Sequence, residues 1–293
     1  MAERIPFAIV GGSGLYSLAG PDEPEIRTVR TPYGPPSDAI RVTWLGDRRV
    51  AFLARHGPNH SLLPSEIDYR ANFWALKSLG VERVLAASAV GSLREDIHPR
   101  EAVAVDQFVD RTHRPSTFFG DGLVAHVALG DPVCPELRSL LVSAGPKCGA
   151  VVHDGGTYLC MEGPAFSTRA ESELYRSWHC DVIGMTNAQE AKLAREAEIC
   201  YASLGLVTDY DCWHETEEAV SVEAVLGVLR RNARMGQETV RRAVAAIAEK
   251  KPACECADAL RYALLTDPAA VPEATRERLR PLIGRYLGGR ARP

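Results

Sequence analysis

Residues 65–87 read SEIDYRANFWALKSLGVERVLAA and combine a helical pattern with a strand pattern. Apolar residues recur with a helical period from Ile67 onward, Ser65 is suited to cap the start of a helix, and Gly80 is suited to end it. The apolar run at residues 84–87 is short and typical of a buried strand. The stretch therefore predicts a helix followed by a strand, which is the order from which α/β folds are built.

The same order of helix and strand occurs twice more toward the C-terminus. A capping-box pattern at Thr168 predicts a helix that reaches about Trp178, and a short strand follows at residues 181–183. A second, alanine-rich helix opens at Thr186 and leads into the apolar run 200–207. Repetition of this order favours a sheet that contains parallel strands.

The two ends of the chain complete the predicted fold. A short strand at residues 7–10 is followed by glycines, and the runs 41–45 and 50–53 flank a turn signal and predict a hairpin. An amphipathic helix is expected from Ser221 to about residue 248. We expect an α/β fold with a mixed central sheet flanked by helices, in a single domain over residues 1–293 whose C-terminal part is helical from about residue 221.

The overall charge argues against two classes of partner. The 293 residues include 34 basic and 38 acidic side chains, which gives a formal net charge of −4 and a pI of about 6.1. No global positive field exists to attract nucleic acid or an anionic membrane, so any bound anion must be held by a few local donors. The N-terminus has no signal-peptide pattern and no apolar run has the length of a membrane span, so we expect a cytoplasmic protein.

The eight cysteines are expected to be reduced, buried thiols. Only Cys254 and Cys256 are close in sequence, and an isolated C-x-C is a weak zinc signal, so no metal site is predicted. In a hyperthermophilic source, Cys254 and Cys256 would be candidates to pair with each other or with Cys200.

Four segments place hydroxyl or cationic donors where strands are expected to end. They are the glycine-rich turn with Ser13, the pair Arg55 and His56, the segment that starts at Ser88, and the helix start at Thr186. Open α/β sheets bind ligands at such strand ends, and glycine, hydroxyl and guanidinium donors suit a phosphate group. Each segment alone is also consistent with a turn or a helix cap. Together they predict an anion site.

Asp209 and Asp211 follow the apolar run 200–207. In an extended chain, the i, i+2 spacing points both carboxylates to one side. Such a pair can accept a hydrogen bond from an amine and, when one member is protonated, donate to a ring nitrogen. The alternative is a polar turn, and a metal site is less favoured because no further acidic cluster adjoins the pair before Glu215.

Five motifs are specific as a set: GGSGL at 11–15, RHGP at 55–58, MEGPAFSTR at 161–169, GMT at 184–186 and TDYDCW at 208–213. Together they resemble the methylthioadenosine phosphorylase branch of the trimeric purine nucleoside phosphorylases. The resemblance covers about residues 7–266.

The resemblance implies a reaction and a set of site residues. The reaction is phosphorolysis of 5′-methylthioadenosine to adenine and 5-methylthioribose 1-phosphate, with inorganic phosphate as co-substrate, no metal and no organic cofactor. The implied phosphate ligands are Ser13, Arg55, His56, Ser88 and Thr186, with backbone help from Ala89. The implied nucleoside contacts are Met185 at the ribose, Phe166 at the base, and Val222 and Val225 near the methylthio group. Core packing is the alternative interpretation of these four.

Three further roles follow from the same resemblance. His126 corresponds to a residue that a neighbouring subunit inserts at the 5′ end of the site, which implies a homotrimer or a dimer of trimers; a solvated loop histidine is the alternative. Asp209, if protonated, would donate to N7 of the purine. Asp211 would accept from the 6-amino group, so the pair favours adenine over hypoxanthine.

Some positions depart from the family pattern. Ala165 stands where the motif usually has Arg, and Asn187 and Gln189 replace residues of the usual sequence after Met-Thr, whereas Ser13 and Ser88 keep a hydroxyl where Thr is frequent. These departures leave open a purine nucleoside phosphorylase of broader or 6-oxopurine preference. The sequence also leaves room for a nucleoside hydrolase or a non-catalytic nucleoside-binding protein, but it lacks the calcium loop typical of nucleoside hydrolases.

Overall fold

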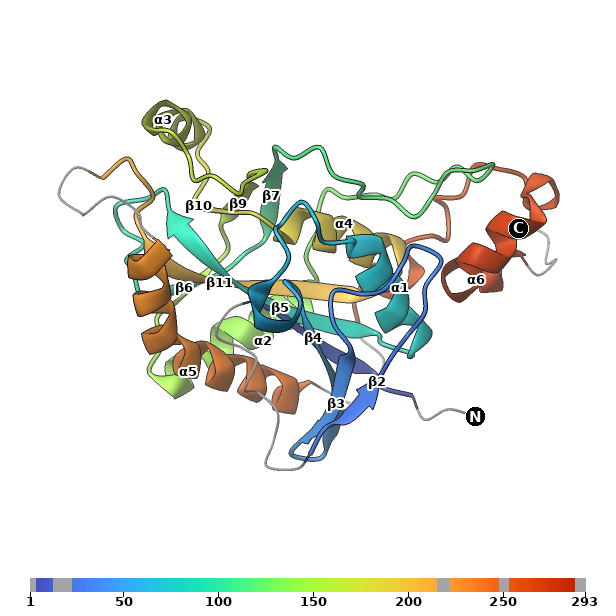
Figure 1. The fold of residues 1–293 in the computed structure, drawn as a ribbon, viewed down its shortest axis with the longest axis horizontal. Helices are drawn as coiled ribbons and strands as arrows, with labels where there is room; N and C mark the ends of the chain where they lie inside the picture. The colour runs from blue at the N-terminus through green and yellow to red at the C-terminus, as the bar shows by residue number, and fades with distance from the viewer. Residues whose placement is uncertain (1–3, 13–22, 215–221, 248–252, 288–293) are drawn as a thin grey trace.

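A computed structural model gives the fold and describes residues 4–12, 23–214, 222–247 and 253–287 (Figure 1). Within these residues, all strands belong to one mixed sheet. The main path of the sheet runs β2-β3-β4-β1-β5-β10-β9-β7, and β11 pairs with β5 and leads to β6 and β8. The strands are β1 (Phe7–Gly11), β2 (Glu25–Arg27), β3 (Ile40–Leu45), β4 (Arg48–Ala54), β5 (Arg83–Ser92), β6 (Ala102–Ala104), β7 (Gln107–Asp110), β8 (Val152–Asp154), β9 (Thr157–Cys160), β10 (Val182–Gly184) and β11 (Cys200–Asp209).

The sheet combines a parallel centre with both parallel and antiparallel pairs around it. Strands β4, β1, β5 and β11 run side by side in the same direction. Strands β2, β3 and β4 are joined antiparallel, and β10 is antiparallel to β5. The predicted hairpin is confirmed by β3 and β4, which pair from Leu45 and Arg48 outward. The expected mixed α/β sheet is therefore confirmed.

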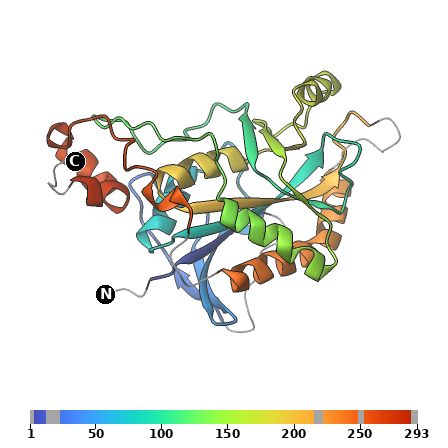
Figure 2. The ribbon, with the colours of Figure 1, turned by 180° about the vertical axis from the view of Figure 1, so that it is seen from behind.

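Helices cover both faces of the sheet (Figures 1 and 2). The helices are α1 (Tyr69–Ser78), α2 (Pro135–Ala144), α3 (Arg169–Ser177), α4 (Asn187–Glu196), α5 (Val222–Ala246) and α6 (Glu273–Leu287). Helix α1 lies against α4 and α6 on one face, where Tyr69, Phe73 and Leu193 enter a common core. Helices α2 and α5 pack together on the other face, around Leu141 and Val244. No described helix combines the length and the apolar character needed to cross a bilayer.

Helix α1 starts later than the sequence pattern predicts. The carboxylate of Asp68, not the hydroxyl of Ser65, caps the helix and accepts a hydrogen bond from the Ala71 N–H at 3.0 Å. The predicted end is confirmed: Gly80 has a φ of 86°, and the N–H of Val81 reaches back to the Leu76 carbonyl at 3.1 Å. The helix therefore starts about one turn later than predicted, because the Asp68 carboxylate stands directly before the first helical residue and binds the N–H of Ala71.

Two further predictions about local structure are corrected. Residues Ser88 to Ser92 were expected beyond a strand end, but β5 continues to Ser92 because β10 and β11 pair with this segment from both sides. The side chain of Thr186 makes no capping hydrogen bond, although α4 begins at the predicted place. The capping box at Thr168 is confirmed and opens α3.

The C-terminal part is helical as predicted, with α5 spanning Val222–Ala246, while the proposed cap at Ser221 lies outside the described residues. The sequence patterns did not predict α2, α6 or the short strands β6 to β9. All eight cysteines are free thiols in the structure.

Candidate active site

A cavity of about 430 Å³ opens at the carboxyl ends of the parallel strands. It is lined by residues that follow β1 and β4, by the outer part of β5, and by residues at the ends of β10 and β11. Ligands of open α/β sheets bind at this edge because loops from several strands converge there. Arg55, His56, Ser88, Ala89, Phe166, Met185, Thr186, Asp209 and Asp211, all predicted from the sequence, line this one cavity.

Arg55 forms the cationic wall of the cavity. Its side chain is 1% exposed and forms a two-pronged ion pair with Glu190, which is also 1% exposed. A third N–H of the guanidinium donates to the Ala87 carbonyl at 3.1 Å. Burial by itself would lower the pKa of Arg55, but the adjacent Glu190 carboxylate outweighs it and raises the pKa. A guanidinium has five N–H donors, so two remain to meet an anion in the cavity.

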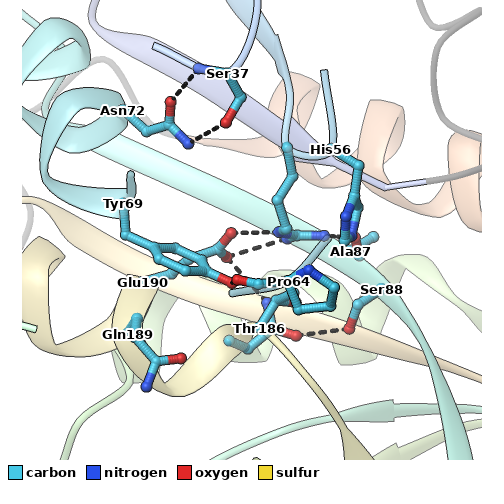
Figure 3. Close-up of polar contacts among 12 residues, drawn as sticks. Ser37, His56, Pro64, Tyr69, Asn72, Ala87, Ser88, Thr186, Gln189 and Glu190 are labelled. Atoms are coloured by element: carbon cyan, nitrogen blue, oxygen red, sulfur yellow. Dashed lines mark hydrogen bonds and ion pairs between the residues drawn. The ribbon is translucent and has the colours of Figure 1, made fainter. Parts of the chain in front are cut away.

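Glu190 is held by neutral donors as well as by Arg55. The hydroxyl of Tyr201 donates to its Oε2 at 2.8 Å, and the side-chain amide of Asn187 donates to the same oxygen at 3.0 Å. The Asn187 carbonyl oxygen in turn accepts from the Ser88 hydroxyl at 2.6 Å. Figure 3 shows Glu190 and Ser88 among these contacts. A buried network thus fixes the orientation of Arg55 and Ser88 before any ligand binds.

His56 is neutral in this environment. Burial and the neighbouring Arg55 charge lower the pKa of His56 to about 3. Its Nδ1 lies 3.0 Å from the Leu62 carbonyl oxygen, which assigns the ring proton to Nδ1 because a carbonyl can only accept. The ring stacks on His60 with centroids 4.2 Å apart. The remaining nitrogen, Nε2, is therefore an acceptor.

Thr186 contributes a hydroxyl and a helix end. It is buried, lines the cavity, and stands directly before α4. Because its hydroxyl is not engaged in capping, it can act on a ligand. The N-terminus of α4 also carries a partial positive charge, which favours an anion at this wall.

The acidic pair lies at the other wall of the cavity. Both oxygens of Asp209 accept hydrogen bonds, one from the Thr208 hydroxyl at 2.6 Å and one from the Asp211 backbone N–H at 2.8 Å. Gly91 allows this approach, since a Cβ there would lie 2.9 Å from Asp209 Oδ1.

Asp211 differs from Asp209 in its environment. Its residue is buried, and its Oδ2 has no hydrogen-bond partner among the described residues. Burial raises the pKa of Asp211, opposed by the nearby hydroxyls of Ser172 and Ser167. The pair therefore combines a carboxyl held by donors with one that protonates more readily.

Apolar side chains close the space between the two polar walls. Met185 and Phe166 line it, and Phe166 is 42% exposed at the rim. The Met185 carbonyl accepts from Arg114 at 2.5 Å, and Arg114 also pairs with Glu162 at 2.9 Å. The loop that carries Phe166 is thereby tied to the strand end that carries Met185.

Other predicted site residues are not brought to this cavity by the described structure. Ser13 and the side chains of Val222 and Val225 lie outside the described residues. His126 is an exposed loop residue away from the cavity of its own chain, where its backbone N–H donates to the Ala263 carbonyl at 2.9 Å. Ala165, which departs from the family motif, is exposed and does not line the cavity.

Sequence reasoning missed the residues that support the anion wall. Glu190, Asn187 and Tyr201 form the network behind Arg55, yet only Asn187 attracted notice, as a departure from a motif. A signal was available for Glu190, because an acidic residue four positions after Thr186 interrupts an otherwise small and apolar helix face. His60, Met161 and Thr208 also line the cavity and were not predicted.

The fold and this cavity agree with the chain's relationship to known proteins. A family model described as the phosphorylase superfamily matches residues 6–245, and the chain belongs to this superfamily. S-methyl-5′-thioadenosine phosphorylases of Koribacter versatilis and Geobacter sulfurreducens are 54% and 53% identical over 283 residues, covering 96% of this chain and 97% and 99% of theirs. Within the superfamily, the chain belongs to the family of the S-methyl-5′-thioadenosine phosphorylases.

Solved structures show the same relationship. A methylthioadenosine phosphorylase sourced from an antarctic soil metagenomic library has a TM-score of 0.90 and 48% identity, with 95% of this chain and 99% of that chain covered. Methylthioadenosine phosphorylase from Schistosoma mansoni, in complex with adenine, has a TM-score of 0.81 and 37% identity, with 85% and 93% covered.

Proposed function

We propose that the protein catalyses phosphorolysis of S-methyl-5′-thioadenosine to adenine and 5-methylthioribose 1-phosphate. The observation that carries this function is the arrangement of the cavity, with a prearranged cationic wall at one side and a carboxyl pair at the other. Its relatives are S-methyl-5′-thioadenosine phosphorylases that match nearly the whole chain, which supports the same reaction here.

Phosphate would occupy the wall formed by Arg55, Ser88 and Thr186. Two guanidinium N–H groups, the Thr186 hydroxyl and the α4 N-terminus supply donors, and Ser88 would add its O–H by turning it from the Asn187 carbonyl to the phosphate. Ala89 and Ser13 complete the set carried over from the family resemblance. His56 plays a different part, because its neutral Nε2 would accept a hydrogen bond from a protonated phosphate oxygen. Held in this way, phosphate is positioned to attack C1′ of the ribose. The entropy cost of bringing the two reactants together then falls on binding and does not add to the barrier of the reaction step.

Cleavage would proceed with charge separation across the cavity. A phosphate oxygen forms the new bond to C1′ while the C1′–N9 bond breaks and its electron pair leaves with adenine. The positive charge that develops on the sugar faces the bound phosphate anion, and the negative charge on the purine faces the Asp pair. A proton given to N7 neutralises the leaving base, and general acid catalysis of this kind contributes about 10²–10⁴-fold to rate.

The two aspartates would divide the recognition of the base. The family resemblance assigns the proton to Asp209, at N7, and the acceptor role to Asp211, at the 6-amino group. Asp211 has the raised pKa, while both oxygens of Asp209 already accept hydrogen bonds. The proposed mechanism therefore requires the bound purine to raise the proton affinity of Asp209 at N7.

The raised pKa of Asp211 also favours a second candidate, a purine nucleoside phosphorylase of broader preference. A protonated Asp211 can donate to the oxygen of a 6-oxopurine, where an ionised carboxylate would be repelled. Steady-state rates on methylthioadenosine, adenosine, inosine and methylthioinosine, each with phosphate, separate the two candidates. The highest kcat/KM is expected for methylthioadenosine, and faster cleavage of inosine would overturn that assignment.

Met185, Phe166, Val222 and Val225 are proposed to contact the sugar, base and methylthio group. His126 is proposed to reach the 5′ end of the nucleoside in a neighbouring subunit of a homotrimer, or of a dimer of trimers. Its exposure on a loop, away from the cavity of its own chain, is consistent with such a role. Inorganic phosphate is the only co-substrate that the proposed chemistry requires.

A further inference from the structure

Four cysteines from three separate parts of the chain converge at one point. Cys134 stands directly before α2, Cys200 is the first residue of β11, and Cys254 and Cys256 belong to the turn that holds a short 3₁₀ helix at Glu255–Asp258. The four sulfur atoms all lie within 4.8 Å of one another. Spacing along the chain does not reveal this group, because 65 residues lie between Cys134 and Cys200 and 53 lie between Cys200 and Cys254.

The sulfur atoms form a compact tetrad and not two separate pairs. The Cys254 sulfur lies 3.6 Å from that of Cys134 and 3.4 Å from that of Cys200, so one atom is shared between two close contacts. Four thiolates at a Zn–S distance of about 2.3 Å around a tetrahedral ion lie about 3.8 Å from one another. The observed separations are close to that value and well above the 2.05 Å, approximately, of an S–S bond.

The cluster lies against an apolar core. Cys134, Cys200 and Cys256 are buried, and Cys254 is half-buried beside the core around Leu141 and Val244. Four thiolates packed this closely against an apolar core would repel one another unless a cation lay between them.

We propose that Cys134, Cys200, Cys254 and Cys256 form a four-thiolate site for Zn²⁺. Soft thiolate ligands select zinc over hard cations such as Mg²⁺ or Ca²⁺. Binding replaces the remaining S–H protons by Zn–S bonds and releases those protons to solvent, so no oxidant or reductant is involved. The bound dication offsets the repulsion among the thiolates.

The site is structural and has no part in the reaction. Four protein ligands leave no open coordination position for substrate or water. Cys200 and Asp209 stand at opposite ends of β11, and at about 3.3 Å per residue this places the metal roughly 30 Å from the acidic pair. The ion would instead attach the segment after residue 253 to β11 and α2.

Metal content of the purified full-length protein tests the proposal. The protein is purified under reducing conditions with zinc present and chelators omitted, then desalted and analysed by elemental mass spectrometry. About one zinc per chain is expected. Cys254→Ser, whose side chain is half-buried, is expected to lose at least about ten-fold in bound zinc, while Cys148→Ser, a cysteine outside the cluster, retains it.

Substitution of zinc by cobalt adds a spectroscopic measurement of the same site. Co²⁺ in a four-thiolate site gives strong sulfur-to-metal charge-transfer absorption, which is expected for the wild type and for Cys148→Ser. Wild-type protein with less than about a tenth of a zinc per chain would overturn the proposal. It would equally be overturned by an intact mass four hydrogens lower without metal, which shows two disulfides, or by equal zinc loss in Cys148→Ser.

Discussion

Replacing Glu190 by Gln removes the counter-charge of Arg55 while keeping the size of the side chain. Both residues are 1% exposed, so solvent cannot take over the role of the carboxylate. Removing one partner of such a buried ion pair costs about 3–5 kcal/mol, because the other charge is left uncompensated. For a chain of 293 residues this corresponds to a fall of about 5–8 °C in the unfolding midpoint, from the usual unfolding entropy per residue.

Phosphate should restore part of the stability that Glu190→Gln loses. This response distinguishes an ion pair at an anion site from a buried ion pair that binds no ligand. In Glu190→Gln the bound phosphate becomes the only counter-charge of Arg55, and the repulsion between phosphate and Glu190 is gone. The gain in stability on adding phosphate should therefore be larger in the variant than in the wild type. At the same time kcat should fall, because Glu190 no longer fixes the orientation of the guanidinium.

Thermal unfolding of both proteins at one protein concentration, with and without phosphate, measures these effects. Glu173→Gln, an exposed glutamate on α3, is the matched control and is expected to change stability by less than about 0.5 kcal/mol. The reasoning would be refuted if Glu190→Gln lost less than about 1 kcal/mol in free energy of unfolding and phosphate stabilised it no more than it stabilises the wild type.

Three more predictions concern the base, the pH dependence and the subunit contact. Asp209→Asn should lower kcat/KM for methylthioadenosine by at least about 100-fold, since an amide can donate a hydrogen bond to N7 but transfers no proton; an unchanged kcat/KM would contradict this. Burial raises the pKa of Glu196 to about 7 from 4.5, so the folded state binds a proton that the unfolded state has released. The resulting stabilisation is present below about pH 4.5 and is lost as the pH rises through 7. Between pH 4.5 and 8, the free energy of unfolding of Glu196→Gln, measured in urea, should therefore gain about 3 kcal/mol relative to that of the wild type. A difference between the two proteins that stays constant with pH would disprove the pKa shift. His126→Ala should raise KM for methylthioadenosine severalfold while leaving KM for phosphate unchanged, and identical KM values would exclude His126 from the site.

Local sequence signals predicted the elements whose ends are set by neighbouring residues. The capping box at Thr168 and the turn between β3 and β4 are examples, and both are confirmed. Elements set by distant pairing were missed or shortened. Strand β5 extends to Ser92 only because β10 and β11 lie on either side of it, and β6 has three residues that are defined by β11 and β8.

The same contrast between neighbouring and distant contacts explains which site residues were predicted and which were missed. Arg55, Thr186 and the Asp pair were found because they follow, or end, apolar runs that become the strands β4, β10 and β11. Glu190 was missed because an acidic residue in a helix usually faces solvent, and its charged partner Arg55 lies 135 positions away in the sequence. The four-cysteine cluster was missed for the same reason, since Cys134 meets the other three only in the folded chain.

Release of adenine from methylthioadenosine, measured with and without phosphate in the wild type and in Asp209→Ala, tests the proposed reaction most directly. We expect adenine to appear only with phosphate and in equal amount with 5-methylthioribose 1-phosphate. Loss of the proton donor should slow the Asp209→Ala variant by about 100-fold or more. Adenine release that proceeds without phosphate, or an Asp209→Ala variant as fast as the wild type, would contradict the account.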